Sequence, residues 1–68
     1  METLEWKLAF DEINLIRGDR MYATVYNSGA WYTWDEDGIG MDNGVADNID
    51  QSMQQASYAV IRQGLIEW

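Results

Sequence analysis

The chain has 68 residues, of which 12 are Asp or Glu and 4 are Lys or Arg, so its formal net charge is −8 at pH 7. This length limits it to one domain, residues 1–68, and the charge argues against direct contact with nucleic acid or an anionic membrane, since both would repel it. The absence of Cys and His excludes disulfides, thiolate metal sites and the side chain best suited to proton transfer near neutral pH.

The first predicted element is a strand over residues 4–10. Its apolar positions alternate with small or charged ones, the period of two that is typical of a half-buried strand. Those positions are Leu4, Trp6, Leu8 and Phe10. Residues 11–19 leave two alternatives open, because an apolar run there ends in a turn-like segment at residues 17–20. The run either extends the sheet or forms a hydrophobic loop packed on it.

The next two elements form a hairpin, with strands over residues 21–26 and 30–34 joined at Asn27-Ser28-Gly29. A two-residue loop at Ser28 and Gly29 separates the two faces cleanly. One face then holds Met21, Ala23, Val25, Tyr32 and Trp34, and the other holds Tyr22, Thr24, Tyr26, Trp31, Thr33 and Asp35. A three-residue loop would instead bring Thr33 and Asp35 to the buried side, so we predict the two-residue loop.

Residues 35–44 are predicted to form a flexible acidic loop, because three glycines fall among the acids. A helix follows, with Asp47 as its N-cap and Asp50 in a pattern that resembles a capping box. Its apolar stripe consists of Ile49, Met53, Ala56 and Val60. Gly64 is the predicted stop after Arg62, and residues 65–68 form either a docked tail or a short edge strand.

These elements predict an α+β fold. It consists of a three-stranded antiparallel sheet with one C-terminal helix packed on one face, in the order β-β-β-α. Trp6, Phe10 and Trp34 are interpreted as core residues. One helix covers only one side of such a sheet, so the face that carries Tyr22, Tyr26 and Trp31 meets either water or a partner. Tyrosine and tryptophan are favoured at interface hot spots, which makes this face a candidate for binding or for self-association.

Acidic residues crowd the segment between the hairpin and the helix. The chain has no Lys, Arg or His between Arg20 and Arg62, while six carboxylates fall within residues 35–50. They are Asp35, Glu36, Asp37, Asp42, Asp47 and Asp50. Such clustering costs folding free energy through self-repulsion, so we expect it to serve binding. The connection between the last strand and the helix is expected to place this charge on one edge of the molecule.

Metal binding and catalysis are both disfavoured. Asp35-x-Asp37 before glycines suggests a calcium loop, but the EF-hand register that starts at Asp35 places Ala46 where a bidentate Glu is required. The segment is interpreted as a solvated acidic loop that attracts Ca²⁺ or Mg²⁺ weakly at most, and no cofactor is expected. No serine has a histidine to activate it, and Lys7 is the only lysine, so we expect no enzymatic activity.

In general character the chain resembles the small acidic proteins that phages encode against bacterial defences, including DNA-mimicking anti-CRISPR and anti-restriction proteins. The resemblance rests on size, on the acidic segment of residues 35–50, on the aromatic hairpin of residues 22–34 and on the lack of a catalytic set. It implies an inhibitor that presents a DNA-like carboxylate surface to a basic nucleic-acid-binding protein or complex. Two alternatives stay open: a non-catalytic interaction module, and a homodimer that uses the face around Tyr22, Tyr26 and Trp31.

The expected location is the cytoplasm, which would be that of the host cell for a phage-encoded protein. The N-terminus is acidic and has no apolar run of the kind found in signal peptides. Uninterrupted apolar stretches such as residues 59–61 are far too short to span a bilayer.

Overall fold

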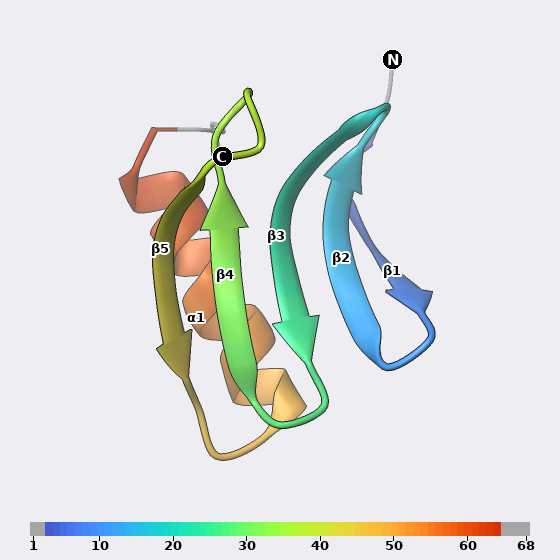
Figure 1. Cartoon of the computed structure of the whole chain (residues 1–68), viewed down its shortest axis with the longest axis vertical. Coiled ribbons are helices and arrows are strands. Elements are labelled where there is room, and N and C mark those ends of the chain that lie inside the picture. The colour runs from blue at the N-terminus through green and yellow to red at the C-terminus, as the bar shows by residue number, and fades with distance from the viewer. Residues whose placement is uncertain (1–2, 65–68) are drawn as a thin grey trace.

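In the computed structural model, which describes residues 3–64, five strands form one antiparallel sheet and a single helix follows them (Figure 1). The elements are β1 (Glu5–Ala9), β2 (Glu12–Arg17), β3 (Arg20–Tyr26), β4 (Ala30–Trp34), β5 (Gly40–Val45) and α1 (Ile49–Arg62). The strands lie side by side in chain order, so β1 and β5 are the edges. The helix packs on one face, against β3, β4 and β5. The predicted α+β class, antiparallel sheet and C-terminal helix are confirmed, but the sheet has five strands, not three.

The two additional strands are β2 and β5. β2 occupies the segment for which the sequence leaves a strand and a packed loop open, and its Leu15 is buried opposite Ala23 of β3. β5 begins inside the predicted acidic loop of residues 35–44, so that prediction is wrong for residues 40–44. Packing explains why a glycine-rich segment forms a strand here. A Cβ at Gly44 would lie 2.7 Å from the indole of Trp31, so the absence of a side chain lets β5 approach β4.

The register of the β3–β4 hairpin differs from the prediction by one residue. Val25 pairs with Trp31 and Ala23 with Thr33, which makes residues 27–29 a three-residue loop. Gly29 has a φ of 93°, a conformation that favours glycine. The sequence disfavours this loop because it buries Thr33. The structure does bury Thr33, but its Oγ1 hydrogen-bonds the Oε1 of Gln63 at 3.2 Å, which removes most of the cost.

A β-bulge at Tyr22 also changes which side chains share a face. Leu15 pairs with Ala23 while the next residue, Ile16, pairs with Met21, so Tyr22 is the extra residue of β3. Tyr22 therefore joins Ala23 in the core, with 2% of its surface exposed, and Met21 turns to the opposite face.

The core lies between α1 and the helix-facing side of the sheet. Its fully buried helix residues are Ser52, Ala56, Ala59 and Val60. Ile49 and Met53 are partly buried and pack against this cluster, so the predicted apolar stripe does face the sheet. From the sheet, Trp31 packs into the same core, and its Nε1 donates a hydrogen bond to Oε1 of Gln55 at 3.0 Å.

The helix begins one residue later than predicted. Asn48, not Asp47, is the N-cap: its backbone is extended, and its Oδ1 accepts a hydrogen bond from the N–H of Gln51 at 2.9 Å. The C-terminal prediction is confirmed, since the helix ends at Arg62 and Gly64 takes a φ of 75°. The predicted tail or edge strand at residues 65–68 lies outside the described residues.

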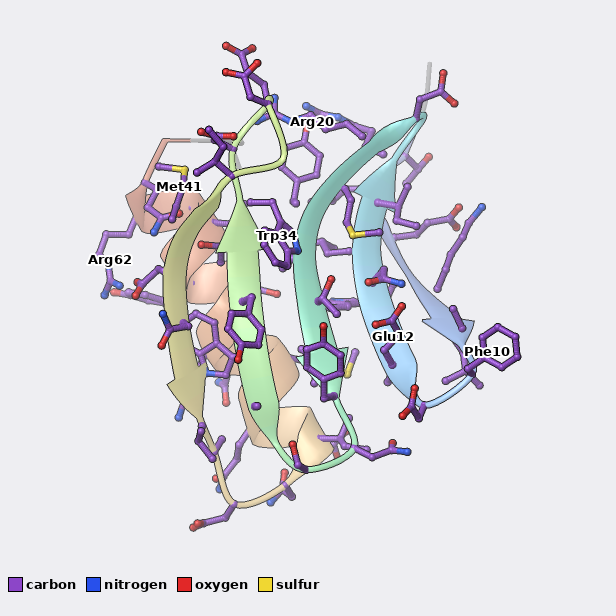
Figure 2. The ribbon with its side chains drawn as sticks, viewed as in Figure 1. Phe10, Glu12, Arg20, Trp34, Met41 and Arg62 are labelled. Atoms are coloured by element: carbon purple, nitrogen blue, oxygen red, sulfur yellow. The ribbon has the colours of Figure 1, made fainter. Side chains whose placement is uncertain are left out.

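Of the three aromatic side chains assigned to the core, only Trp6 packs against it. Phe10 is fully exposed at the β1–β2 turn and points away from the molecule (Figure 2). The alternation that suggested its burial ends with Ala9, the last residue of β1, and Phe10 has a φ of 51° in the turn. Trp34 is half-buried, but it lies on the sheet face opposite α1.

Candidate binding surface

The sheet face that points away from α1 is not covered by any other part of residues 3–64 (Figure 1). Its centre is formed by large side chains of β3 and β4, which we call the aromatic face. They are Met21, Tyr26, Tyr32 and Trp34. The rings of Tyr26 and Tyr32 meet edge to face with centroids 5.8 Å apart, and Tyr32 stacks on Trp34 at 5.9 Å. The three rings therefore form one continuous row that a partner would meet as a unit.

Buried hydrogen bonds fix the aromatic face from below. The hydroxyl of Thr24 donates to Oδ1 of Asn14 at 2.7 Å and accepts from Nε1 of Trp34 at 3.0 Å. Thr24 and Asn14 are 3% and 4% exposed, so the indole of Trp34 covers two buried polar side chains that are hydrogen-bonded to each other. A partner would meet a ring that is already held in place, which lowers the entropy cost of binding.

The aromatic face is nearly free of charge, although the chain as a whole is strongly acidic. None of the described residues of β3, β4 and β5 that point away from the helix is charged. These residues are Met21, Thr24, Tyr26, Ala30, Tyr32, Trp34, Gly40, Asn43 and Val45. On β2, Glu12 lies on this face beside Tyr26 (Figure 2). The composition matches an interface core, where charged residues are depleted and Tyr, Trp and Met are enriched.

The β4–β5 turn brings carboxylates next to the aromatic face. Oδ1 of Asp35 accepts hydrogen bonds from the backbone N–H groups of Asp37 and Ile39, both at 2.9 Å, so Asp35 organises the turn from within. Glu36 and Asp37 are exposed. We call residues 35–38 the acidic turn.

A cleft of about 720 Å³ separates the acidic turn from the β2–β3 turn. The ladder between β3 and β4 ends at Ala23 and Thr33, so the two hairpins diverge beyond that point. Trp34 and Met21 line the cleft on the side of the aromatic face, and Arg17 and Arg20 line it on the other.

Both arginines of the cleft are engaged with Tyr22. Arg17 donates from Nη2 to the hydroxyl of Tyr22 at 2.9 Å, and the guanidinium carbon of Arg20 lies 4.5 Å from the centre of the same ring. Among the described residues, neither arginine comes within 4 Å of a carboxylate. Within residues 3–64, Glu36 and Asp37 therefore form no ion pair, although basic groups line the same cleft.

The six carboxylates of the predicted acidic edge are distributed along β5 and do not form one cluster. The acidic turn precedes β5, while Asp47 and Asp50 follow it at the opposite end of the sheet (Figure 1). Between them, Asp42 is neutralised by Arg62, with Nη2 and Oδ2 3.1 Å apart. The six carboxylates thus form two separate groups and one ion pair.

The aromatic residues proposed from sequence divide in a similar way. Tyr26 does lie on the free face of the sheet. Tyr22 and Trp31 are core residues, 2% and 6% exposed, so assigning them to a partner surface is wrong. Tyr32 and Trp34 lie on the free face of the sheet instead. The predicted two-residue loop places these two side chains on the face opposite to Tyr26. The three-residue loop would have placed Tyr32 and Trp34 correctly, since the one-residue slip exchanges every side chain of β4.

Comparisons with protein-family models, with curated proteins and with solved structures found no match. Over residues 3–64, no three acidic side chains converge in a way that would hold a metal ion. In the same part of the chain, α1 is too short and too polar to cross a bilayer.

Proposed function

We propose that the protein is a non-catalytic binding domain that attaches to a basic protein surface through its aromatic face. The observation that carries this proposal is the uncharged row of Tyr26, Tyr32 and Trp34, uncovered in a chain of net charge −8. Exposed apolar area of this kind marks interaction sites on soluble proteins. Stacked rings also provide large contact area at little cost in side-chain entropy.

Charge selects the partner. The acidic turn presents Glu36 and Asp37 beside Trp34, and neither carboxylate has a partner in an ion pair within the described residues. A basic surface would gain ion pairs with these two groups, and an arginine of the partner would also gain a cation–π contact on the indole. An acidic surface, or a second copy of this strongly acidic chain, would be repelled there.

Catalysis has little support at this site. The cleft beside Trp34 is lined by arginines and carboxylates and contains no serine, threonine or lysine. The hydroxyl of Thr24, at the base of the face, already makes two hydrogen bonds, one to Asn14 and one from Trp34. Binding without chemistry is the simpler use of such a surface.

In a second candidate function, the basic partner is a nucleic-acid-binding protein. The chain would then block the nucleic-acid-binding site of that partner, as small acidic phage inhibitors of bacterial defence do. The carboxylates on either side of β5 favour this function. A six-residue strand spans about 20 Å, and duplex DNA carries about twelve phosphates over that length. The chain offers six carboxylates there, one of them paired with Arg62, so any imitation of DNA is at best half as dense.

Site-specific crosslinking tests the binding domain. A photoreactive phenylalanine analogue replaces Tyr32 on the aromatic face or Tyr58, which is 67% exposed on α1. In an extract of the source cells we expect a discrete protein adduct from position 32 and none from position 58. The adduct should weaken when Glu36→Gln and Asp37→Asn are combined, and should persist with Asp47→Asn and Asp50→Asn, which change the net charge equally. Equal adducts from both positions, or none from position 32, would exclude the aromatic face.

The second candidate has its own readout. If the crosslinked partner binds labelled duplex DNA, the purified chain should displace that DNA at stoichiometric concentration. A partner that keeps its DNA while it binds the chain would leave the binding domain intact and remove the mimicry.

A further inference from the structure

The two edges of the sheet differ in how well they are protected against pairing. β5 has a bulge at Met41, two glycines and the carboxylate of Asp42, all of which discourage a new strand from adding there. β1 has a regular register with β2 and no bulge. Within residues 3–64 no segment covers its outer edge (Figure 1).

The sequence of this unprotected edge is complementary to itself. Residues 4–8 read LEWKL. When this segment is reversed, as it is in an antiparallel partner strand, Glu5 and Lys7 exchange positions and the apolar positions remain apolar. We propose that β1 pairs antiparallel with β1 of a second copy about a two-fold axis at Trp6, giving a homodimer with one continuous sheet. Glu5 then faces Lys7 of the other copy on one side of the sheet, and Leu4 faces Leu8 of the other copy on the opposite side.

The backbone of β1 fits this register. Ala9 pairs with Glu12 across a two-residue turn, and in such a hairpin the closing pair is hydrogen-bonded. The antiparallel alternation then directs the N–H and C=O groups of Lys7 and Glu5 toward β2, and those of Trp6 and Leu8 toward the free edge. An axis at Trp6 joins these free groups to each other. It also places Glu5 and Lys7 in the non-hydrogen-bonded positions, where opposite side chains approach most closely.

Charge makes this register preferable to its neighbours. An axis at Lys7 would set the only lysine of the chain against its own copy, and an axis at Glu5 would do the same with a carboxylate. In the single chain, Lys7 and Glu5 already lie 3.3 Å apart, and their side chains are 60% and 55% exposed. The strand is therefore locally neutral in a chain of net charge −8, so self-pairing meets the least repulsion here.

Burial points the same way. Leu8 is 77% exposed although it belongs to a strand, and Leu4 and Trp6 are only partly buried. Pairing at the edge would cover Leu8 with Leu4 of the other copy. The aromatic face stays free in this dimer, so the dimer can be tested independently of the proposed function.

Sedimentation velocity of charge variants tests the dimer. The unmodified chain should shift from the monomer mass to twice that mass over a concentration series up to about 1 mM, a range that reveals even weak contacts. Glu5→Lys alone and Lys7→Glu alone should stay monomeric, because each sets like charges opposite one another. Their equimolar mixture should form dimers again, since the lysine introduced in one variant then faces the glutamate introduced in the other.

A matched control separates this register from a general effect of charge. Glu36→Lys makes the same charge change as Glu5→Lys but lies away from β1, so this variant should still dimerise. A chain that is monomeric throughout, or a mixture that is no more dimeric than its components, would overturn the proposal.

Disulfide trapping tests the register itself, because the chain has no native Cys. Glu5→Cys mixed with Lys7→Cys should give a crosslinked dimer under mild oxidation, since directly opposed positions meet disulfide geometry. Glu5→Cys alone should crosslink far less, because its copies are offset along the strand. Equal yields in both samples would contradict an axis at Trp6.

Discussion

The indole of Trp31 covers Gly44 so closely that a Cβ at position 44 would lie 2.7 Å from the ring. The two residues are directly paired across β4 and β5. This contact lets a glycine-rich edge strand join the sheet, because the large core side chain occupies the space that a side chain on β5 would otherwise fill.

Gly44→Ala should therefore destabilise the protein by about 1–3 kcal/mol, the usual cost of overpacking a well-filled site. Gly40→Ala is the matched control on the same strand, since its Cβ would meet Trp34 at an ordinary 3.6 Å. Urea unfolding of both variants measures the difference. Similar losses for the two would show that the contact with Trp31 does not limit position 44.

The fold was partly predictable because some signals are local. The strand predicted over residues 4–10, the stripe of α1 and its stop at Gly64 depend on neighbours in sequence. The stripe and the stop are confirmed, and the strand is confirmed as β1, which ends at Ala9. β5 was not predictable from propensity, since its place in the sheet depends on Trp31, thirteen residues away.

The candidate surface was missed for a related reason. The choice between a two-residue and a three-residue loop depended on whether Thr33 is acceptable in the core, and Gln63 of the distant helix end supplies its hydrogen bond. The bulge at Tyr22 then reversed the faces at the start of β3. Neither the hydrogen bond nor the bulge can be recognised from the local sequence pattern. Tyr22 and Trp31 were therefore assigned to the free face, where Tyr32 and Trp34 lie.

The hydroxyl of Thr24 should be critical for the order of the aromatic face. Thr24→Val removes the group that joins Asn14 to Trp34 and leaves a buried amide oxygen without this donor. We expect a loss of about 1–3 kcal/mol, the range for leaving a buried polar group unsatisfied. Thr24→Ser keeps the hydroxyl and should lose less, as measured by urea unfolding. A valine variant as stable as the serine variant would contradict the role of this network.

Tyr32 should matter for binding more than for folding. It is 38% exposed and lies at the centre of the aromatic face, where it meets Tyr26 edge to face and stacks on Trp34. Tyr32→Ala should weaken binding to the crosslinked partner by at least about tenfold, as expected for an aromatic hot spot. Tyr58→Ala, on the exposed side of α1, is the control and should leave the affinity within about twofold. Isothermal titration calorimetry with the purified partner compares them, and equal losses would move the interface away from the sheet.

Salt should raise the melting temperature of the unmodified chain. The described residues contain two ion pairs, Glu5–Lys7 and Asp42–Arg62, so most carboxylates repel one another and dissolved ions screen that repulsion. Combining Glu36→Gln with Asp37→Asn should reduce the rise, because it removes two unpaired charges, whereas Asp42→Asn should change it less, because it also releases Arg62. Calorimetry from about 10 mM to 500 mM NaCl, where the screening length falls from about 30 Å to below 8 Å, measures the slope. A flat or falling melting temperature would mean that the carboxylates of the acidic turn are already compensated, as Asp35 is by the N–H groups of Asp37 and Ile39.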